Sequence, residues 1–234
     1  MPIHREGQHL VNSDLQGNLL IGMESESLQD CIAEAKRRHA YGVFGNPEWG
    51  FHEQDLDCLA DLSDIKSVWF WDVNLRDIEG LYRLTGLRSF GVHSKRPPVD
   101  FGRLPTLESI VWHYNARDRG LERLTQLRQL SIWHSKLKTK TLQSVTLPRC
   151  LEDLEFVWSN IVSLVGLPEF PKLRRMAIHR CRNLEGIKGL PQIAPHLEHL
   201  TVANCGRVKD GAEVVRQMPS LRFASVQGVV LVKP

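Results

Sequence analysis

The sequence predicts a solenoid, a fold in which short repeats of the chain stack one on the next. The pattern L-x-x-L-x-L, where x is any residue and the other positions are apolar, recurs at steps of 20 to 24 residues. Its copies are IKSVWF (65–70), LRSFGV (87–92), LESIVW (107–112), LRQLSI (127–132), LEDLEF (151–156), LRRMAI (173–178), LEHLTV (197–202) and the weaker LRFASV (221–226). Most intervals carry an apolar residue at every third position, as in Ile78, Leu81 and Leu84, which predicts a 3₁₀ or helical turn on the far side of each coil.

Two stretches relate these repeats to a known family. NLRDIEGLYRLTGLRSFGV (74–92) is similar to the short bacterial repeats of internalin-like proteins, and RCRNLEGIKGL and NCGRVKDG resemble cysteine-containing repeats. Over roughly residues 50–226, the chain thus resembles the leucine-rich repeat family. The resemblance implies an α/β solenoid, with a curved parallel sheet on the concave face and short helices or 3₁₀ turns on the convex side. It also implies an inward Asn or Cys after each strand, a position filled here by Asn115, Cys181 and Cys205, but by Val73, Lys95, Ser135 and Ser159 elsewhere.

The two ends of the chain are expected to cap the array, because its terminal coils would otherwise expose their core. We predict an N-terminal cap over 1–54, an array of about eight coils over 55–226 and a C-terminal cap or tail over 227–234. The first cap is expected to hold a hairpin within 8–22, an amphipathic helix over 25–40 and a strand at 41–44. Predicted capping boxes start the helix at Ser27 with Asp30 and a late helix at Asp210 with Glu213.

The dipeptide Trp-His occurs twice, at 112–113 and 133–134, and raises the question of a repeated chemical site. Side chains alternate between the two faces of a strand. The pattern places Trp112 inward and His113 outward. In the second copy Ile132 takes the core position, so Trp133 faces outward. The two dipeptides are therefore out of register by one residue and do not form a repeated site.

The outward positions of successive strands nevertheless gather aromatic and charged residues into a band. Eight strands at ~4.8 Å spacing would make it roughly 34 Å long. Scattered exposed aromatics are ordinary on protein surfaces, but a row of Trp, Tyr and Arg on one face is typical of a binding surface. We therefore predict partner binding by Trp69, Trp71, His93, His113, Tyr114, Trp133, His134, Asp153, Glu155, Trp158, His179 and Arg180.

The sequence offers little to support catalysis or metal binding. It contains no G-x-S-x-G, phosphate-binding glycine loop or H-E-x-x-H. Asp153 and Glu155 share the outward face of one strand, and an open sheet favours an acidic contact patch over an acid–base pair. His93 and His113 are neighbours in the band, with no third ligand beside them. We predict no catalytic residues, no metal and no cofactor.

Composition and charge point to a cytoplasmic protein. The chain is 42% hydrophobic and 24% charged, and its five cysteines include no CxxC pair. No apolar run has the length of a signal peptide or a membrane span, so we expect no membrane association. The net charge of +3 divides into −7 over residues 1–94 and +10 over 95–234, an asymmetry that would steer a charged partner. The Lys and Arg residues are scattered singly, which argues against nucleic acid.

These features favour a non-enzymatic module that binds another protein. The resemblance implies that short bacterial repeat proteins of this kind act as adaptors or neutralising partners. A toxin-immunity protein, which blocks a cognate toxin inside the producing cell, is one concrete form. The alternative is an exported effector or adaptor that binds host proteins. Nucleic-acid binding and an accessory role to an enzyme remain outside alternatives.

Overall fold

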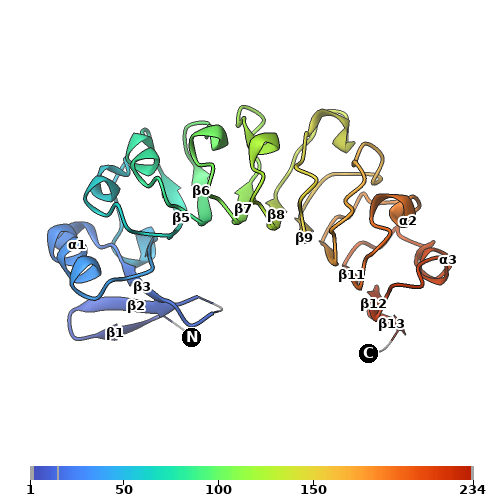
Figure 1. Ribbon diagram of the computed structural model, residues 1–234, viewed down its shortest axis with the longest axis horizontal. Coiled ribbons are helices and arrows are strands. Elements are labelled where there is room, and N and C mark those ends of the chain that lie inside the picture. The colour runs from blue at the N-terminus through green and yellow to red at the C-terminus, as the bar shows by residue number, and fades with distance from the viewer. Residues whose placement is uncertain (1–2, 15, 233–234) are drawn as a thin grey trace. The chain divides into compact units, whose positions relative to one another are not determined.

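The structure is a computed structural model that describes residues 3–14 and 16–232. Its chain forms two compact units, which divide between Ile110 and Val111. In each unit the strands lie side by side, and the helical turns lie on the opposite side of the coils (Figure 1). We call unit 1 the part before this division and unit 2 the part after it.

Unit 1 contains one α-helix, α1 (Leu28–Arg37), within its described residues. Its strands are β1 (His4–Glu6), β2 (His9–Ser13), β3 (Leu19–Gly22), β4 (Gly42–Gly45), β5 (Ser67–Asn74) and β6 (Ser89–Lys95). Its 3₁₀ helices are Ser25–Ser27, Pro47–Trp49, Asp57–Asp61, Glu79–Arg83 and Phe101–Arg103. The strand β7 (Ser109–His113) crosses the division between the units.

Unit 2 repeats the same kind of coil. Its strands are β8 (Gln129–Trp133), β9 (Asp153–Val157), β10 (Arg175–His179), β11 (His199–Ala203), β12 (Phe223–Val226) and β13 (Val229–Val232). Its helical turns are the 3₁₀ helices Leu121–Arg123 and Leu142–Ser144 and the short α-helices α2 (Leu190–Ile193) and α3 (Gly211–Arg216).

Strand pairing confirms the predicted parallel coils. β3 to β6 are parallel neighbours in unit 1, and β8 to β12 are parallel neighbours in unit 2. The first coils are preceded by the antiparallel strands β1 and β2, and the last is closed by antiparallel β13. Each of the eight copies of the repeat pattern contributes one strand, from β5 to β12.

The alternation predicted for the two Trp-His copies is confirmed by burial. Trp112 and Ile132 are 5% and 1% exposed, whereas His113 and Trp133 are only half-buried. The indole N–H of Trp112 donates a hydrogen bond to the Asp118 carboxylate at 2.7 Å. This bond satisfies the one polar atom of the Trp112 side chain, so the large ring is tolerated in the core.

The predicted capping boxes are wrong at both helices. Ser27 precedes α1, but its hydroxyl makes no capping bond and lies 3.7 Å from the Cys31 sulfur instead. Asp210 precedes α3 and also makes no cap. Its carboxylate accepts the backbone N–H groups of Ile187 and Lys188 in the preceding coil at 2.9–3.1 Å. At Asp210, bonding between coils has taken the place of local capping.

The inward position after each strand is also partly different from the prediction. Cys181 and Cys205 are fully buried, and Val73, Ser135 and Ser159 are buried as well. The hydroxyls of Ser135 and Ser159 bind each other across adjacent coils. Lys95, in contrast, is exposed: a register shift between β5 and β6 pairs Val73 with Ser94, one residue earlier than the prediction.

The two tryptophans of the Trp-His copies should differ in their contribution to stability. Trp112→Ala removes a buried ring and leaves a cavity, so we expect a loss of about 3–5 kcal/mol in the free energy of unfolding. Trp133→Ala truncates a half-exposed ring and should cost about 1 kcal/mol or less. Chemical denaturation of both variants measures this difference. A larger loss for Trp133→Ala than for Trp112→Ala would show that the register is wrong.

Thiol reactivity should follow burial. Cys31, Cys58, Cys181 and Cys205 are buried, and only Cys150 is partly exposed. The neighbouring Cys205 sulfur and burial both raise the pKa of the Cys181 thiol, and burial raises the pKa of Cys58 to about 12. We therefore expect a thiol reagent at pH 7.5 to label Cys150 first in the native protein, and the others only after denaturation, as read by mass spectrometry of peptides. Rapid native labelling of Cys181 and Cys205 would contradict the inward assignment.

Candidate binding face

The residues that follow β8, β9, β10 and β11 share a backbone conformation that the sequence analysis did not predict. His134, Trp158, Arg180 and Asn204 each have a φ between 52° and 57°, in the left-handed region. In a continued strand each of these side chains would turn inward. The positive φ redirects the chain so that the next residue, Ser135 for the first of them, takes the inward position. The last residue of each strand and the residue that follows it therefore form two outward columns, beside the outward positions within the strands, such as Glu155.

A stack of rings runs along the second of these columns. The His113 and His134 rings are 5.2 Å apart, and the His134 ring lies parallel to Trp158 at 4.7 Å with an interplanar angle of 15°. The Arg180 guanidinium lies 4.9 Å from the Trp158 ring. Trp133 meets the edge of Trp158 at 5.9 Å. Trp158 remains 39% exposed, although His134 and Arg180 approach it from the coils on either side.

A chain of polar contacts runs beside the stack. The Trp133 indole N–H donates to the Ser131 hydroxyl at 2.7 Å, and that hydroxyl donates to the Glu155 carboxylate. The other oxygen of Glu155 lies 3.7 Å from His179 Nε2. Asp153 accepts a hydrogen bond from Arg175 at 2.8 Å. These contacts fix the carboxylates in place, and each has a basic neighbour rather than a partner carboxylic acid.

Seven of the twelve predicted residues therefore meet within this network of unit 2, and Asp153 lies on the same strand as Glu155, bound to Arg175. We define the aromatic face of unit 2 as His113, Trp133, His134, Asp153, Glu155, Trp158, His179 and Arg180.

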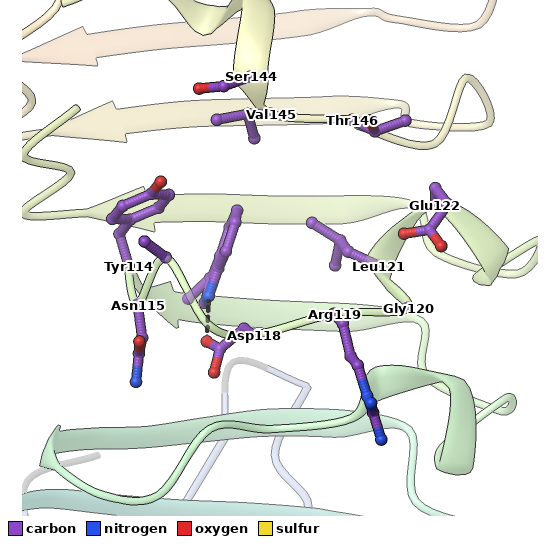
Figure 2. Close-up of a pocket in the computed structure, with 12 residues that line it drawn as sticks. Tyr114, Asn115, Asp118, Arg119, Gly120, Leu121, Glu122, Ser144, Val145 and Thr146 are labelled. Atoms are coloured by element: carbon purple, nitrogen blue, oxygen red, sulfur yellow. Dashed lines mark hydrogen bonds between the residues drawn. The ribbon is translucent and has the colours of Figure 1, made fainter. Parts of the chain in front are cut away.

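Tyr114 departs from this face. Its ring packs against Trp112 at 5.1 Å, and it lines a pocket of about 310 Å³ that opens between two successive coils. Figure 2 shows Tyr114 and Leu121 on one side of this pocket and Val145 and Thr146 on the other. The Asp118 carboxylate in its wall is bound to the Trp112 indole, so at least one polar group of the pocket serves the fold.

In unit 1, the predicted residues Trp69 and Trp71 cover a second apolar cluster. Leu10, Leu20 and Phe44 are buried on the outward side of the sheet, and the two tryptophans pack on them. The Trp71 ring lies 6.3 Å from Phe44 and 5.2 Å from Trp49. Phe44 pairs with Trp69 in the strand register, which places both on the same face.

A glycine makes room for the first of these rings. A Cβ atom on Gly91 would lie 2.0 Å from the Trp69 ring, so the ring rests directly on the backbone of β6. His93 then meets the edge of Trp69 at 5.9 Å. In this unit the aromatic residues are half-buried parts of a packed cap, with their outer edges at the surface.

Comparison with solved structures identifies the fold. Internalin C2 from Listeria monocytogenes matches 75% of this chain and 77% of its own, with a TM-score of 0.53 and 14% sequence identity. The fold is that of a leucine-rich repeat protein. Internalin F from the same organism matches 88% of this chain with a TM-score of 0.52 and 13% identity, and this leucine-rich repeat chain spans 64% of its length. No family model and no curated protein matches the sequence.

We also searched the described part of the leucine-rich repeat structure for other pockets, metal sites and membrane-spanning helices. A pocket of about 580 Å³ in unit 1 lies at the end of α1, and Lys36, His39, Tyr41 and Asp64 are among its lining residues. Within residues 3–14 and 16–232, no group of three His, Cys, Asp or Glu residues is arranged to hold a metal ion. In the same described part, no helix has the length and apolar character to cross a membrane.

Sequence reasoning missed three contributors to these faces. Ser131 links Trp133 to Glu155, Arg175 holds Asp153, and Phe44 anchors the tryptophans of unit 1. The spacing of the repeats could have predicted these two contacts between coils, because Ser131 and Arg175 occupy outward positions one coil away from Glu155 and Asp153. For Phe44, the only indication in the sequence is the alternation in YGVF: because Val43 is inward, Phe44 faces outward.

The surroundings of His134 in the folded protein should be measurable as a lowered pKa of its imidazole. Burial and the nearby Lys136 ammonium lower the pKa of the His134 imidazole. The folded state thus favours neutral His134, and protonation should destabilise the fold as the pH falls from about 6.5, the unfolded value, towards the lower folded value. A nuclear magnetic resonance titration of the ring should give a midpoint below 6.5. Lys136→Gln should raise it, because a positive neighbour is lost; a midpoint above 6.5 in the parent would mean that attraction to Trp158 prevails instead.

Proposed function

We propose that this leucine-rich repeat chain is a non-enzymatic protein-binding module and that the aromatic face of unit 2 contacts its partner. The observation that carries the proposal is the stack of His134, Trp158 and Arg180. Trp and Arg dominate the energetic centres of protein interfaces, and a ring already fixed by its neighbours loses little conformational entropy when it binds. The exposed edge of Trp158 offers such a prearranged anchor.

The contacts of the carboxylates support binding over catalysis. A general acid needs a raised pKa, which burial or a second carboxylate supplies. Asp153 and Glu155 are half-exposed, and each contacts a basic side chain, Arg175 or His179, rather than a second carboxylate. Carboxylates held in this way suit charge-matched contacts with a partner.

The remaining predicted residues belong to the same proposal. Trp69, Trp71 and His93 of unit 1 expose their outer edges above the packed cap and are proposed as additional contacts. Tyr114 is proposed as a contact through the rim of the pocket beside Trp112. Within the class of protein-binding modules, we propose a toxin-immunity protein that acts in the cytoplasm. The alternative, an exported effector or adaptor, predicts a partner from a host cell rather than from the producing cell.

Site-specific photo-crosslinking tests the binding face directly. A benzophenone amino acid would replace Trp133 or Trp158, and a matched control would replace Val165, an exposed apolar residue outside the face. We expect both face positions to crosslink the same protein in the producing cell, as identified by mass spectrometry, and the control position not to do so. The captured protein should then bind Trp133→Ala at least about 2 kcal/mol more weakly if the residue is a hot spot.

Two outcomes would contradict this proposal. One is the absence of any adduct from either face position. The other is the same set of adducts from all three positions, which would indicate non-specific contact. A toxin encoded by the same cell would support the immunity role, and a host protein would support the effector role instead.

A further inference from the structure

Three of the four segments that follow β8 to β11 carry basic residues and no acidic ones, and the segment after β9 is uncharged. The four segments 134–140, 158–164, 180–184 and 204–209 contain no Asp or Glu. They contain seven basic residues, and all of these are exposed: Lys136, Lys138, Lys140, Arg180, Arg182, Arg207 and Lys209. We call these residues the basic edge. It follows directly on β8, β10 and β11, the strands that carry or flank the aromatic face.

The opposite ends of the strands carry alternating charges. There, one residue per coil alternates in sign along Arg128, Glu152, Arg174, Glu198 and Arg222. Neighbours in this series lie 3.6–4.0 Å apart where they form ion pairs. At the basic edge, no ion pair is found for any of the seven cations among the described residues. Asp210, which follows the fourth segment, accepts backbone N–H groups of the preceding coil instead.

The basic edge adjoins the ring stack through Arg180, which belongs to both. Arg180 packs on Trp158 from one side, and His134 packs on it from the other. Because both faces of Trp158 are covered, a nucleic-acid base has no open ring face on which to stack, and base stacking is the main sequence-tolerant contact in single-strand binding. An acidic peptide needs only the cations and the exposed edge of the ring. The arrangement therefore favours a protein ligand over a nucleic acid.

We propose that the partner presents an acidic segment, rich in Asp and Glu, which binds along the basic edge of unit 2. This inference rests on the proposed function and specifies the chemistry of its partner. Coils from β8 to β11 cover three strand spacings, about 14 Å, which an extended segment spans with about four residues. Carboxylates along such a segment would face the cations of the coils that follow β8, β10 and β11, and the uncharged segment after β9 lies between the first two of these. A neutral segment would leave these cations without counter-charges at the interface.

A defined acidic peptide tests the proposal without knowledge of the partner. The probe is a fluorescein-labelled peptide of about ten alternating Glu and Asp residues, long enough to exceed the edge. Fluorescence anisotropy should show binding to the full chain, at least about tenfold weaker when the salt concentration rises from 50 to 500 mM, because screening shortens the reach of the charges. An oligothymidylate of equal length should bind more weakly than the peptide.

Matched variants distinguish the basic edge from net charge. The double variant Lys136→Gln with Arg182→Gln should weaken peptide binding at least about fivefold. The control, Arg128→Gln with Arg222→Gln, removes the same charge from the other ends of the strands and should change binding less than twofold. Circular dichroism melts check that both variants fold. Equal losses in the two variants, no peptide binding, or tighter binding of the oligothymidylate would each overturn the proposal, and none of these results affects the crosslinking test of the protein-binding face.

Discussion

After each of the strands β8 to β11, the chain passes through one residue with a positive φ. The arrangement of the aromatic face depends on this backbone constraint. The N–H groups of His134, Trp158 and Arg180 donate to the carbonyls of Val157, His179 and Ala203 in the next coil, at 2.9–3.0 Å. The sheet ladder thus continues through the bend. The bend then sends the following Ser or Cys inward, where it meets its counterpart one coil away. Core and outward face are therefore set by the same residue.

The strain of this backbone conformation is a reason to assign a function to the aromatic face. A non-glycine residue in the left-handed region costs roughly 1–2 kcal/mol, and Asn tolerates that region better than His, Trp or Arg. The chain uses Asn at one such position, Asn204, and large side chains at the three before it. Bulky residues in a strained conformation, stacked and half-exposed, are typical of surfaces selected for a function rather than for stability. The binding proposal follows from that contrast.

The same residue types have different surroundings in the two units. Trp69 and Trp71 rest on Leu10, Leu20 and Phe44. Trp158 instead lies against the His134 ring, the Trp133 ring and the Arg180 guanidinium. Periodicity predicted all eight strands and the inward place of Trp112, because these depend on alternation alone. It could not predict the apolar cluster of unit 1, which depends on strands from the N-terminal hairpin. It also failed where a long-range bond replaced a local one, as at Asp210, and where the register shifts before Lys95.

The central claim is that the stacked column is held for binding and not for folding. Its most direct test is the free energy of unfolding of a triple variant, His134→Asn with Trp158→Asn and Arg180→Asn. Each ring contact contributes about 0.5–1.5 kcal/mol, and relief of the left-handed strain returns a similar amount. We expect the variant to unfold within about 1 kcal/mol of the parent, since these opposing contributions nearly cancel. A loss of more than about 3 kcal/mol, the size expected for removal of a core residue, would show that the column holds the fold together.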